Sequence, residues 1–165
     1  MNNTCLAALD RAKVTNRGDI GEVIFGNVLS ANLGQAPARQ IALGCQIPPT
    51  VPCTTVNRVC SSGMKAIILG AQSIALGTNN VVVVGGSESM SNTPYYVPKM
   101  RTGAKYGHSE ILDGIMKDGL MDVYNQCLMG DAAEVCAESH GFNRDDSVLK
   151  IELDSCASAH LYFQC

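Results

Sequence analysis

The feature that most constrains this chain is a cysteine placed where an extended segment runs into a long apolar helix. Residues 51–56 are predicted to be extended, and residues 60–76 carry apolar side chains at helical spacing and are followed by Gly77. Cys60 therefore stands at the start of the predicted helix. The N-terminal end of a helix favours negative charge, and the thiolate is the nucleophilic form of cysteine. Cys60 is thus a candidate nucleophile; the alternative is a buried, structural cysteine, which is common for free thiols.

The order of the predicted elements indicates an α/β fold. Residues 23–29 and 81–84 are nearly continuous apolar runs, typical of parallel strands covered on both faces. Because strands and helices alternate along the chain, we expect parallel pairing. The helix at 60–76 has so little polar surface that it is predicted to be buried between layers. The other elements expected here are a helix around Leu6–Ala12, a helix at 36–43, the strand at 51–56 and a sharp turn at Gly85-Gly86.

The character of the sequence changes after Ser91. Residues 92–125 are rich in proline, glycine and tyrosine and have fewer continuous apolar runs, which indicates a long excursion away from the sheet. Helices are predicted at 109–117 and at 130–140, the second ended by Gly141, and residues 143–147 are predicted to start another helix. The periodicity of residues 148–165 is mixed and predicts no element.

Composition excludes several classes of function. The net charge is -3 and no run of lysine or arginine occurs, which argues against a nucleic acid or an anionic membrane as partner. The eight cysteines form no Cys-x-x-Cys pair and the three histidines show no metal-ligand spacing, so no metal site is expected. No signal peptide pattern and no apolar stretch of transmembrane length is present, so reduced thiols inside the cell are expected.

Several segments, in one order along the chain, resemble the thiolase family. Together they extend from residue 5 to residue 146, and the wording around Cys60 is most similar to the acetoacetyl-CoA branch, the acetyl-CoA C-acetyltransferases. The segments are Gly-Asn-Val-Leu at 26–29, Leu-Gly-Gln-Ala-Pro-Ala-Arg-Gln at 33–40, Val-Asn-Arg-Val-Cys-Ser-Ser-Gly-Met-Lys-Ala-Ile at 56–67, Gly-Gly-Ser-Glu-Ser-Met-Ser-Asn-Thr-Pro-Tyr at 85–95, Lys-Asp-Gly-Leu-Met-Asp at 117–122 and Met-Gly-Asp-Ala-Ala-Glu at 129–134.

The resemblance implies a two-stage acyl transfer. Cys60 would take an acetyl group from one acetyl-CoA, and a second acetyl-CoA would attack the acetyl-cysteine to give acetoacetyl-CoA and CoA. No resident cofactor is implied, because coenzyme A is part of substrate and product. The complete family forms homo-oligomers, and a cytoplasmic location is expected, with the peroxisome or mitochondrion as alternatives.

The resemblance also implies an incomplete thiolase fold. It places part of the N-terminal α/β domain at residues 1–91, the start of the family's loop domain at 92–146, and an unmatched tail at 147–165. The Gly-His-Pro, Cys-x-Gly-Gly-Gly and Asn-Glu-Ala-Phe strings that carry the rest of the family's chemistry do not occur in the 165 residues. We therefore expect a chain cut at both ends. The alternative function is an inactive product, without a role of its own or associating with full-length thiolase.

Other candidate residues follow from the same comparison. Met129 resembles a methionine that lines the acyl pocket of the family, and ordinary core packing is the alternative. Glu88 is interpreted as a structural hydrogen-bonding residue. The histidines are predicted to be surface or capping residues and not substitutes for the missing base; they are His108, His140 and His160.

Overall fold

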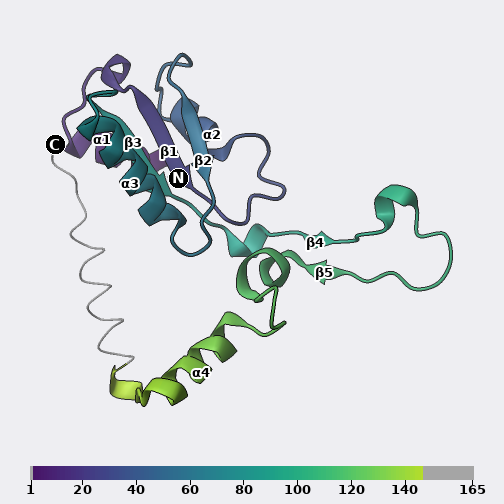
Figure 1. Ribbon diagram of the computed structural model, residues 1–165. Coiled ribbons are helices and arrows are strands. Elements are labelled where there is room, and N and C mark those ends of the chain that lie inside the picture. Colours follow the sequence, from purple (N-terminus) through teal and green to yellow (C-terminus); the bar gives the residue numbers. More distant parts are fainter. Residues whose placement is uncertain (1, 147–165) are drawn as a thin grey trace. The chain divides into compact units, whose positions relative to one another are not determined.

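The structure, a computed structural model, describes residues 2–146 (Figure 1). The chain divides into two compact units, Met1–Gly119 and Leu120–Cys165. The described part of each unit is considered separately below. The expected boundary at residue 91 concerns the family's domains and remains a prediction. The expected tail at 147–165 and His160 lie outside the described residues.

A three-stranded parallel sheet forms the centre of the first unit. Its strands are β1 (Glu22–Gly26), β2 (Cys53–Val56) and β3 (Val82–Gly86), in the spatial order β2-β1-β3. The predicted α/β class and parallel pairing are confirmed. β1 is buried from Val23 to Gly26, as expected for a central strand covered on both faces.

Two strand boundaries differ from the prediction. β1 ends at Gly26 and not at residue 29, because the N–H groups of Val28 and Leu29 donate to the Glu88 carboxylate and not to a neighbouring strand. The predicted turn at Gly85-Gly86 is wrong. Both glycines pair with β1 as the last residues of β3, and a Cβ on Gly85 would lie 2.8 Å from the Phe25 ring.

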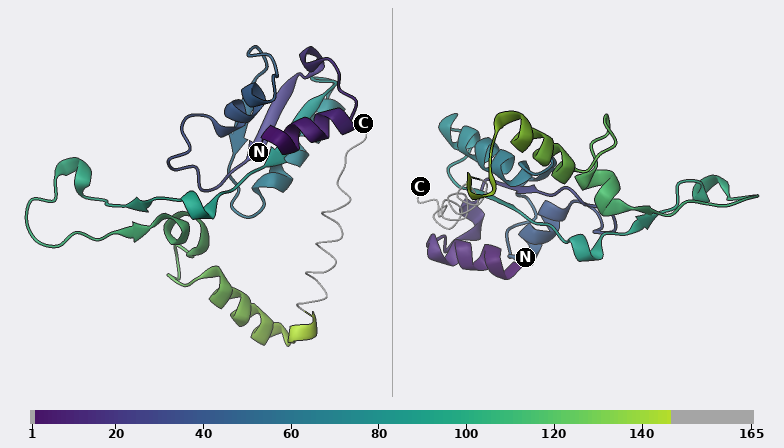
Figure 2. Two further views of the ribbon diagram at one scale, coloured as in Figure 1. Left: turned by 180° about the vertical axis from the view of Figure 1, so that it is seen from behind. Right: turned by 90° about the horizontal axis from the view of Figure 1, so that it is seen from below.

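Two helices cover one face of the sheet, α1 (Asn2–Arg11) and α2 (Pro37–Gly44) (Figure 2). α2 begins with Pro37, which suits the first helical turn because its missing N–H would have no partner there. The two helices pack against one face of β1. Together with residues of the neighbouring loops they form the main hydrophobic core. The core consists of Cys5, Leu9, Ile20, Val23, Phe25, Ala38, Ile41, Ala42, Cys45, Ile47 and Val51.

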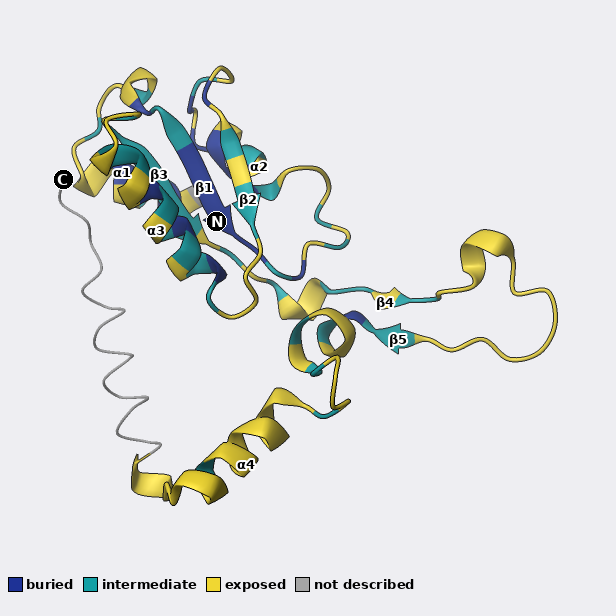
Figure 3. Ribbon diagram, viewed as in Figure 1, coloured by how far each residue is buried: buried dark blue, intermediate teal, exposed yellow. Residues whose placement is uncertain are grey.

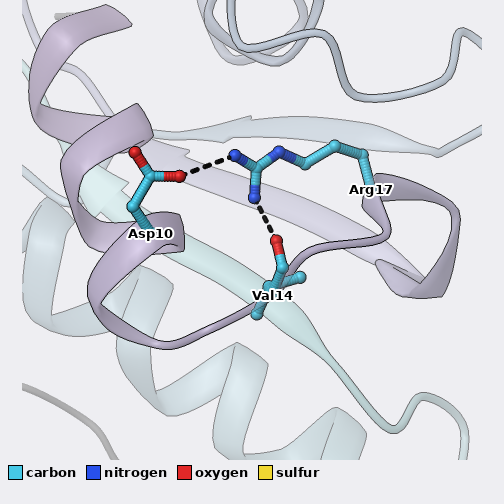
Figure 4. Close-up of polar contacts among 3 residues, drawn as sticks. All are labelled: Asp10, Val14 and Arg17. Carbon is cyan, nitrogen blue, oxygen red and sulfur yellow. Dashed lines mark hydrogen bonds and ion pairs between the residues drawn. The ribbon is translucent and has the colours of Figure 1, made fainter.

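Arg17, in the short 3-10 helix η1 (Arg17–Asp19), binds both α1 and the loop that follows it (Figure 4). The Arg17 guanidinium lies 3.0 Å from the Asp10 carboxylate and also donates to the carbonyl oxygen of Val14. Asp10 is largely exposed, so the ion pair contributes at most about 1 kcal/mol.

The opposite face of the sheet carries α3 (Ser62–Ala75). Its buried residues, Ser62, Ala66 and Gly70, follow one another at four-residue spacing and face the strands. Within the described part of the first unit, α3 is covered on one side only, and the expectation that it is buried between two layers is wrong there. Met64 is 64% exposed, Ile68 42% and Leu76, directly after the helix, 82%, because no other element of that unit packs on this side (Figure 3).

The rest of the first unit is an excursion, as predicted. It contains an antiparallel pair, β4 (Tyr95–Tyr96) and β5 (Leu112–Asp113), with short 3-10 helices at Met90–Asn92 and Met100–Thr102. The predicted helix at 109–117 is wrong in its first half. Helical structure begins only at residue 114, where the Asp113 carboxylate accepts the N–H of Ile115, and continues as a π-helix, η4 (Met116–Leu120).

The second unit contains α4 (Met129–His140). Its predicted end is confirmed, because Gly141 caps it with a φ of 68°, in the left-handed region that glycine adopts without strain. The start of a further helix at residue 143 is also confirmed. Asn143 and Asp146 each bond the backbone N–H of the other through their side chains, at 3.0 Å.

Candidate functional site

The predicted junction around Cys60 is present. β2 ends at Val56, α3 begins at Ser62, and Cys60 lies exposed in the turn between them. An exposed thiol next to the N-terminus of a helix can meet a substrate from solution, and the free N–H groups of such a terminus stabilise negative charge. Cys60 is therefore not a buried, core-filling cysteine in this structure, and its role as nucleophile stays a prediction.

The turn is held in a conformation that the sequence did not reveal. Val59, directly before Cys60, has a φ of 49°, in the left-handed region that β-branched residues rarely adopt. The Asn57 side chain accepts the N–H of Val59 at 2.9 Å. The Ser62 hydroxyl accepts the N–H of Arg58 at 2.8 Å and donates to the carbonyl of Val59 at 2.6 Å. In the sequence, only Asn57 indicated a turn stabilised by a side chain, because asparagine often accepts the N–H of the residue two positions later.

Gly26 lets the N-terminus of α3 approach the end of β1. A Cβ on Gly26 would lie 2.5 Å from the carbonyl carbon of Ser62 and 2.6 Å from the backbone nitrogen of Gly63. These distances are too short for any side chain, so the first turn of the helix rests directly on the strand. This contact therefore determines the distance between the sheet and the Cys60 turn, which directly precedes α3.

Glu88 joins the loop after β1 to the loop after β3. Its carboxylate accepts the N–H groups of Val28 and Leu29 and the side-chain amide of Asn27, at 2.9 to 3.0 Å. The Asn27 amide also donates to the carbonyl of Ser87. The predicted structural role of Glu88 is confirmed. Both loops follow the carboxyl ends of parallel strands, the edge of the sheet at which ligands bind in open α/β folds.

The remaining described cysteines of the first unit are poor nucleophiles. Cys5 and Cys45 are buried in the core, and burial together with the hydrogen bond between the two thiols raises the pKa of Cys5 to about 12. Burial likewise raises the pKa of Cys53. A protonated thiol is not nucleophilic, so these groups act as small apolar side chains.

Two histidines lie in the described part of the chain, His108 in the first unit and His140 in the second. His140 ends α4, and its Nδ1 lies 3.0 Å from the carbonyl of Cys136. His108 is exposed and lines a shallow depression with Pro98, Lys99, Ser109 and Glu110. Their predicted surface and capping roles are confirmed. Within residues 2–146, no histidine is hydrogen-bonded to the thiol of Cys60.

Met129 is the first residue of α4 and is 41% exposed. It belongs to the second unit, whereas Cys60 belongs to the first, so the structure describes their surroundings separately. A role for Met129 in an acyl pocket stays a prediction. Among residues 2–146, no three His, Cys, Asp or Glu side chains are grouped as metal ligands, and no helix has the length and apolarity needed to cross a membrane.

Comparison with known proteins identifies the family. The thiolase N-terminal domain matches residues 1–148. The chain belongs to the thiolase family. Acetyl-CoA acetyltransferase 2 of Arabidopsis thaliana is 61% identical over 139 residues, which are 84% of this chain and 34% of the plant protein. Acetyl-CoA acetyltransferase IB of Candida tropicalis is 56% identical over 140 residues, 85% of this chain and 35% of the yeast protein.

A solved structure gives the same result. The crystal structure of the Acat5 thiolase from Ascaris suum in complex with coenzyme A superposes with a TM-score of 0.79 at 46% sequence identity, over 85% of this chain and 36% of the worm protein. The fold is therefore that of part of a thiolase. This thiolase chain spans about a third of the length of the curated relatives that it matches.

Proposed function

We propose that this chain carries the acyl-accepting cysteine of an acetyl-CoA C-acetyltransferase, and that Cys60 is that cysteine. The observation that carries the proposal is the exposed thiol of Cys60, held in a strained turn at the N-terminus of α3. Strained backbone at an exposed nucleophile is a frequent property of active sites. The names of the similar proteins, acetyl-CoA acetyltransferases, supply the substrate class.

In the proposed reaction the Cys60 sulfur attacks the carbonyl carbon of acetyl-CoA. A carbon–sulfur bond to Cys60 forms, the bond from the acetyl group to CoA breaks, and CoA leaves as a thiolate that takes up a proton. A second acetyl-CoA, deprotonated at its methyl carbon, then attacks the carbonyl carbon of the acetyl-cysteine. The new carbon–carbon bond gives acetoacetyl-CoA, the bond from the acetyl group to Cys60 breaks, and Cys60 is released as a thiolate. Coenzyme A is part of substrate and product, so the proposal includes no resident cofactor.

The acylation half-reaction and the full condensation make different demands. Acylation needs a base that forms the Cys60 thiolate and donors for the developing oxyanion, and condensation also needs a base for the carbon acid. The family's activating histidine and second catalytic cysteine lie in the Gly-His-Pro and Cys-x-Gly-Gly-Gly strings, which do not occur in the 165 residues. For this chain we therefore propose only acceptance of the acetyl group by Cys60, with the helix N-terminus as the group that favours its thiolate. The condensation is proposed for the complete protein, with homo-oligomers and a cytoplasmic location; one relative is named cytosolic.

Acetyl-CoA is expected to acetylate this chain at Cys60. After incubation with acetyl-CoA, mass spectrometry of the proteolysed chain should find one acetyl group on the peptide that contains Cys60. The Cys60→Ser variant should remain unmodified, and the exposed Cys136 serves as an internal control for nonspecific thiol acetylation. Equal acetylation of Cys60 and Cys136, or none under conditions that acetylate a full-length relative, would refute the proposal.

A second candidate function is association with a full-length acetyl-CoA acetyltransferase. It is favoured by the apolar side chains exposed on α3 and directly after it, Met64, Ile68 and Leu76, since exposed apolar surface marks interaction sites. The chain should co-elute in size-exclusion chromatography with purified acetyl-CoA acetyltransferase IB. The Met64→Lys/Ile68→Lys variant should lose co-elution, whereas Ile111→Lys, a change at an exposed site outside α3, should keep it. Separate elution of the unmodified chain would remove this candidate.

A further inference from the structure

The turn before Cys60 holds Val59 in a conformation that valine avoids. A residue other than glycine with a positive φ costs about 1 to 3 kcal/mol and persists only where its surroundings enforce it. Val59 is itself exposed, so burial of its side chain does not enforce the conformation. The enforcing groups must be sought among the hydrogen bonds of the turn.

Two side chains bind both polar groups of Val59. The Asn57 Oδ1 accepts the N–H of Val59, and the Ser62 hydroxyl donates to its carbonyl oxygen, at 2.9 and 2.6 Å. Ser62 is only 5% exposed, and its hydroxyl also accepts the N–H of Arg58, so the hydroxyl connects the two ends of the turn. The backbone adds weaker support, with N–H groups of Ser61 and Ser62 donating to the carbonyls of Arg58 and Val59 at 3.2 and 3.1 Å.

We propose that Asn57 and Ser62 are positioning residues for Cys60. They hold Val59 in the left-handed conformation, and this conformation directs the chain so that the next residue, Cys60, stands at the N-terminus of α3. The inference rests on the proposed role of Cys60 as acyl acceptor, because positioning matters only for a group that reacts. It assigns to the two side chains a role that acts through the backbone of Val59 and not through contact with substrate.

This role differs in a measurable way from ordinary stabilisation of the fold. If Asn57 acts by holding Val59 left-handed, its importance should depend on the residue at position 59. Glycine adopts a positive φ without steric cost, so Val59→Gly removes the strain that Asn57 opposes. The effects of Asn57→Ala and Val59→Gly should therefore not be additive, which is the signature of two groups that act on one conformation.

The test is the rate of alkylation of Cys60 by iodoacetamide in the full 165-residue chain, followed by mass spectrometry of the peptides. In Asn57→Ala we expect alkylation of Cys60 to be about fivefold slower, the effect of losing one hydrogen bond that holds a strained turn. Asn57→Ser keeps an uncharged side-chain oxygen as acceptor for the N–H of Val59 and should retain more of the parent rate than Asn57→Ala. Asn57→Ala in the Val59→Gly background should slow alkylation less than in the parent.

Ser62→Ala is expected to slow the reaction similarly, with the exposed Ser109→Ala as matched control at the parent rate. Alkylation of Cys136 and the circular dichroism spectrum should be unchanged in each variant, which separates positioning from unfolding. The inference would be overturned if Asn57→Ala left the alkylation rate of Cys60 unchanged or raised it. It would also be overturned if Asn57→Ala slowed alkylation equally in the parent and in the Val59→Gly background. Because iodoacetamide replaces acetyl-CoA, failure of Cys60 to accept acetyl leaves this result intact and refutes the proposed function alone.

Discussion

Gly26→Ala is expected to destabilise the chain by about 3 kcal/mol, the upper part of the range for forcing an extra methyl group into packed structure. The new Cβ would lie 2.5 to 2.7 Å from backbone atoms of Ser62 and Gly63, and neither backbone can rotate away as a flexible side chain would. The first turn of α3 must move off the end of β1, or β1 must shift within the sheet. Urea unfolding followed by circular dichroism measures the change.

Gly63→Ala is the matched control. Gly63 is the second residue of α3, and a Cβ there would meet no atom within 4 Å. Since alanine loses less conformational entropy than glycine in a helix, this variant should gain about 0.5 to 1 kcal/mol. Replacing glycine by alanine should thus lower the free energy of unfolding at position 26 and raise it at position 63, although the two residues lie on opposite sides of one contact. A Gly26→Ala variant as stable as the parent would show that the helix does not rest on the strand.

The elements that the sequence predicted well are those whose signal is local. The apolar run at residues 23–29 predicted a strand, and β1 is present at Glu22–Gly26. The helical spacing at residues 60–76 predicted a helix, and α3 is present at Ser62–Ala75. Pro37 and Gly141 mark helix ends by their own backbone preferences, and each lies at such an end. The predicted strand and helix placed Cys60 at their junction, where the structure has it.

The elements that sequence reasoning missed depend on contacts between distant segments. Gly85 and Gly86 suggested a turn, but they extend β3 because the Phe25 ring of the neighbouring strand occupies the space that a side chain would need. The pattern at 109–117 resembled a helix, yet Leu112 and Asp113 pair with Tyr95 and Tyr96 in β4. Neither partner can be found from the periodicity of the segment itself.

The candidate site shows the same division. The cysteine and the small residues after it carry a motif, whereas Val59, which determines how the cysteine is presented, carries no signal because valine is disfavoured at a positive φ. The sequence therefore indicated the candidate nucleophile, Cys60, and not the backbone conformation of the turn that holds it. Asn57 and Ser62 lie inside the matched motif, but their role is apparent only from their bonds to Val59.

Ile24→Ala is expected to destabilise the chain by about 3 kcal/mol, within the range measured for truncation of buried isoleucine to alanine. Ile24 is 3% exposed in the centre of β1, and by strand alternation it shares with Gly26 the face on which α3 packs. Its neighbour in register is Val84, which lies against Gly70 of α3. Truncation therefore opens a cavity beneath the helix that carries the Cys60 turn.

The matched control for this prediction is Ile111→Ala, the same truncation at a side chain that is 68% exposed, for which a change within about 0.5 kcal/mol is expected. The free energy of unfolding of both variants is measured in urea. If both variants lost the same free energy of unfolding, α3 would not cover that face of β1. A loss confined to Ile24, together with iodoacetamide labelling of the normally buried Cys5 at a lower urea concentration, would show that packing of α3 on β1 supports the whole first unit.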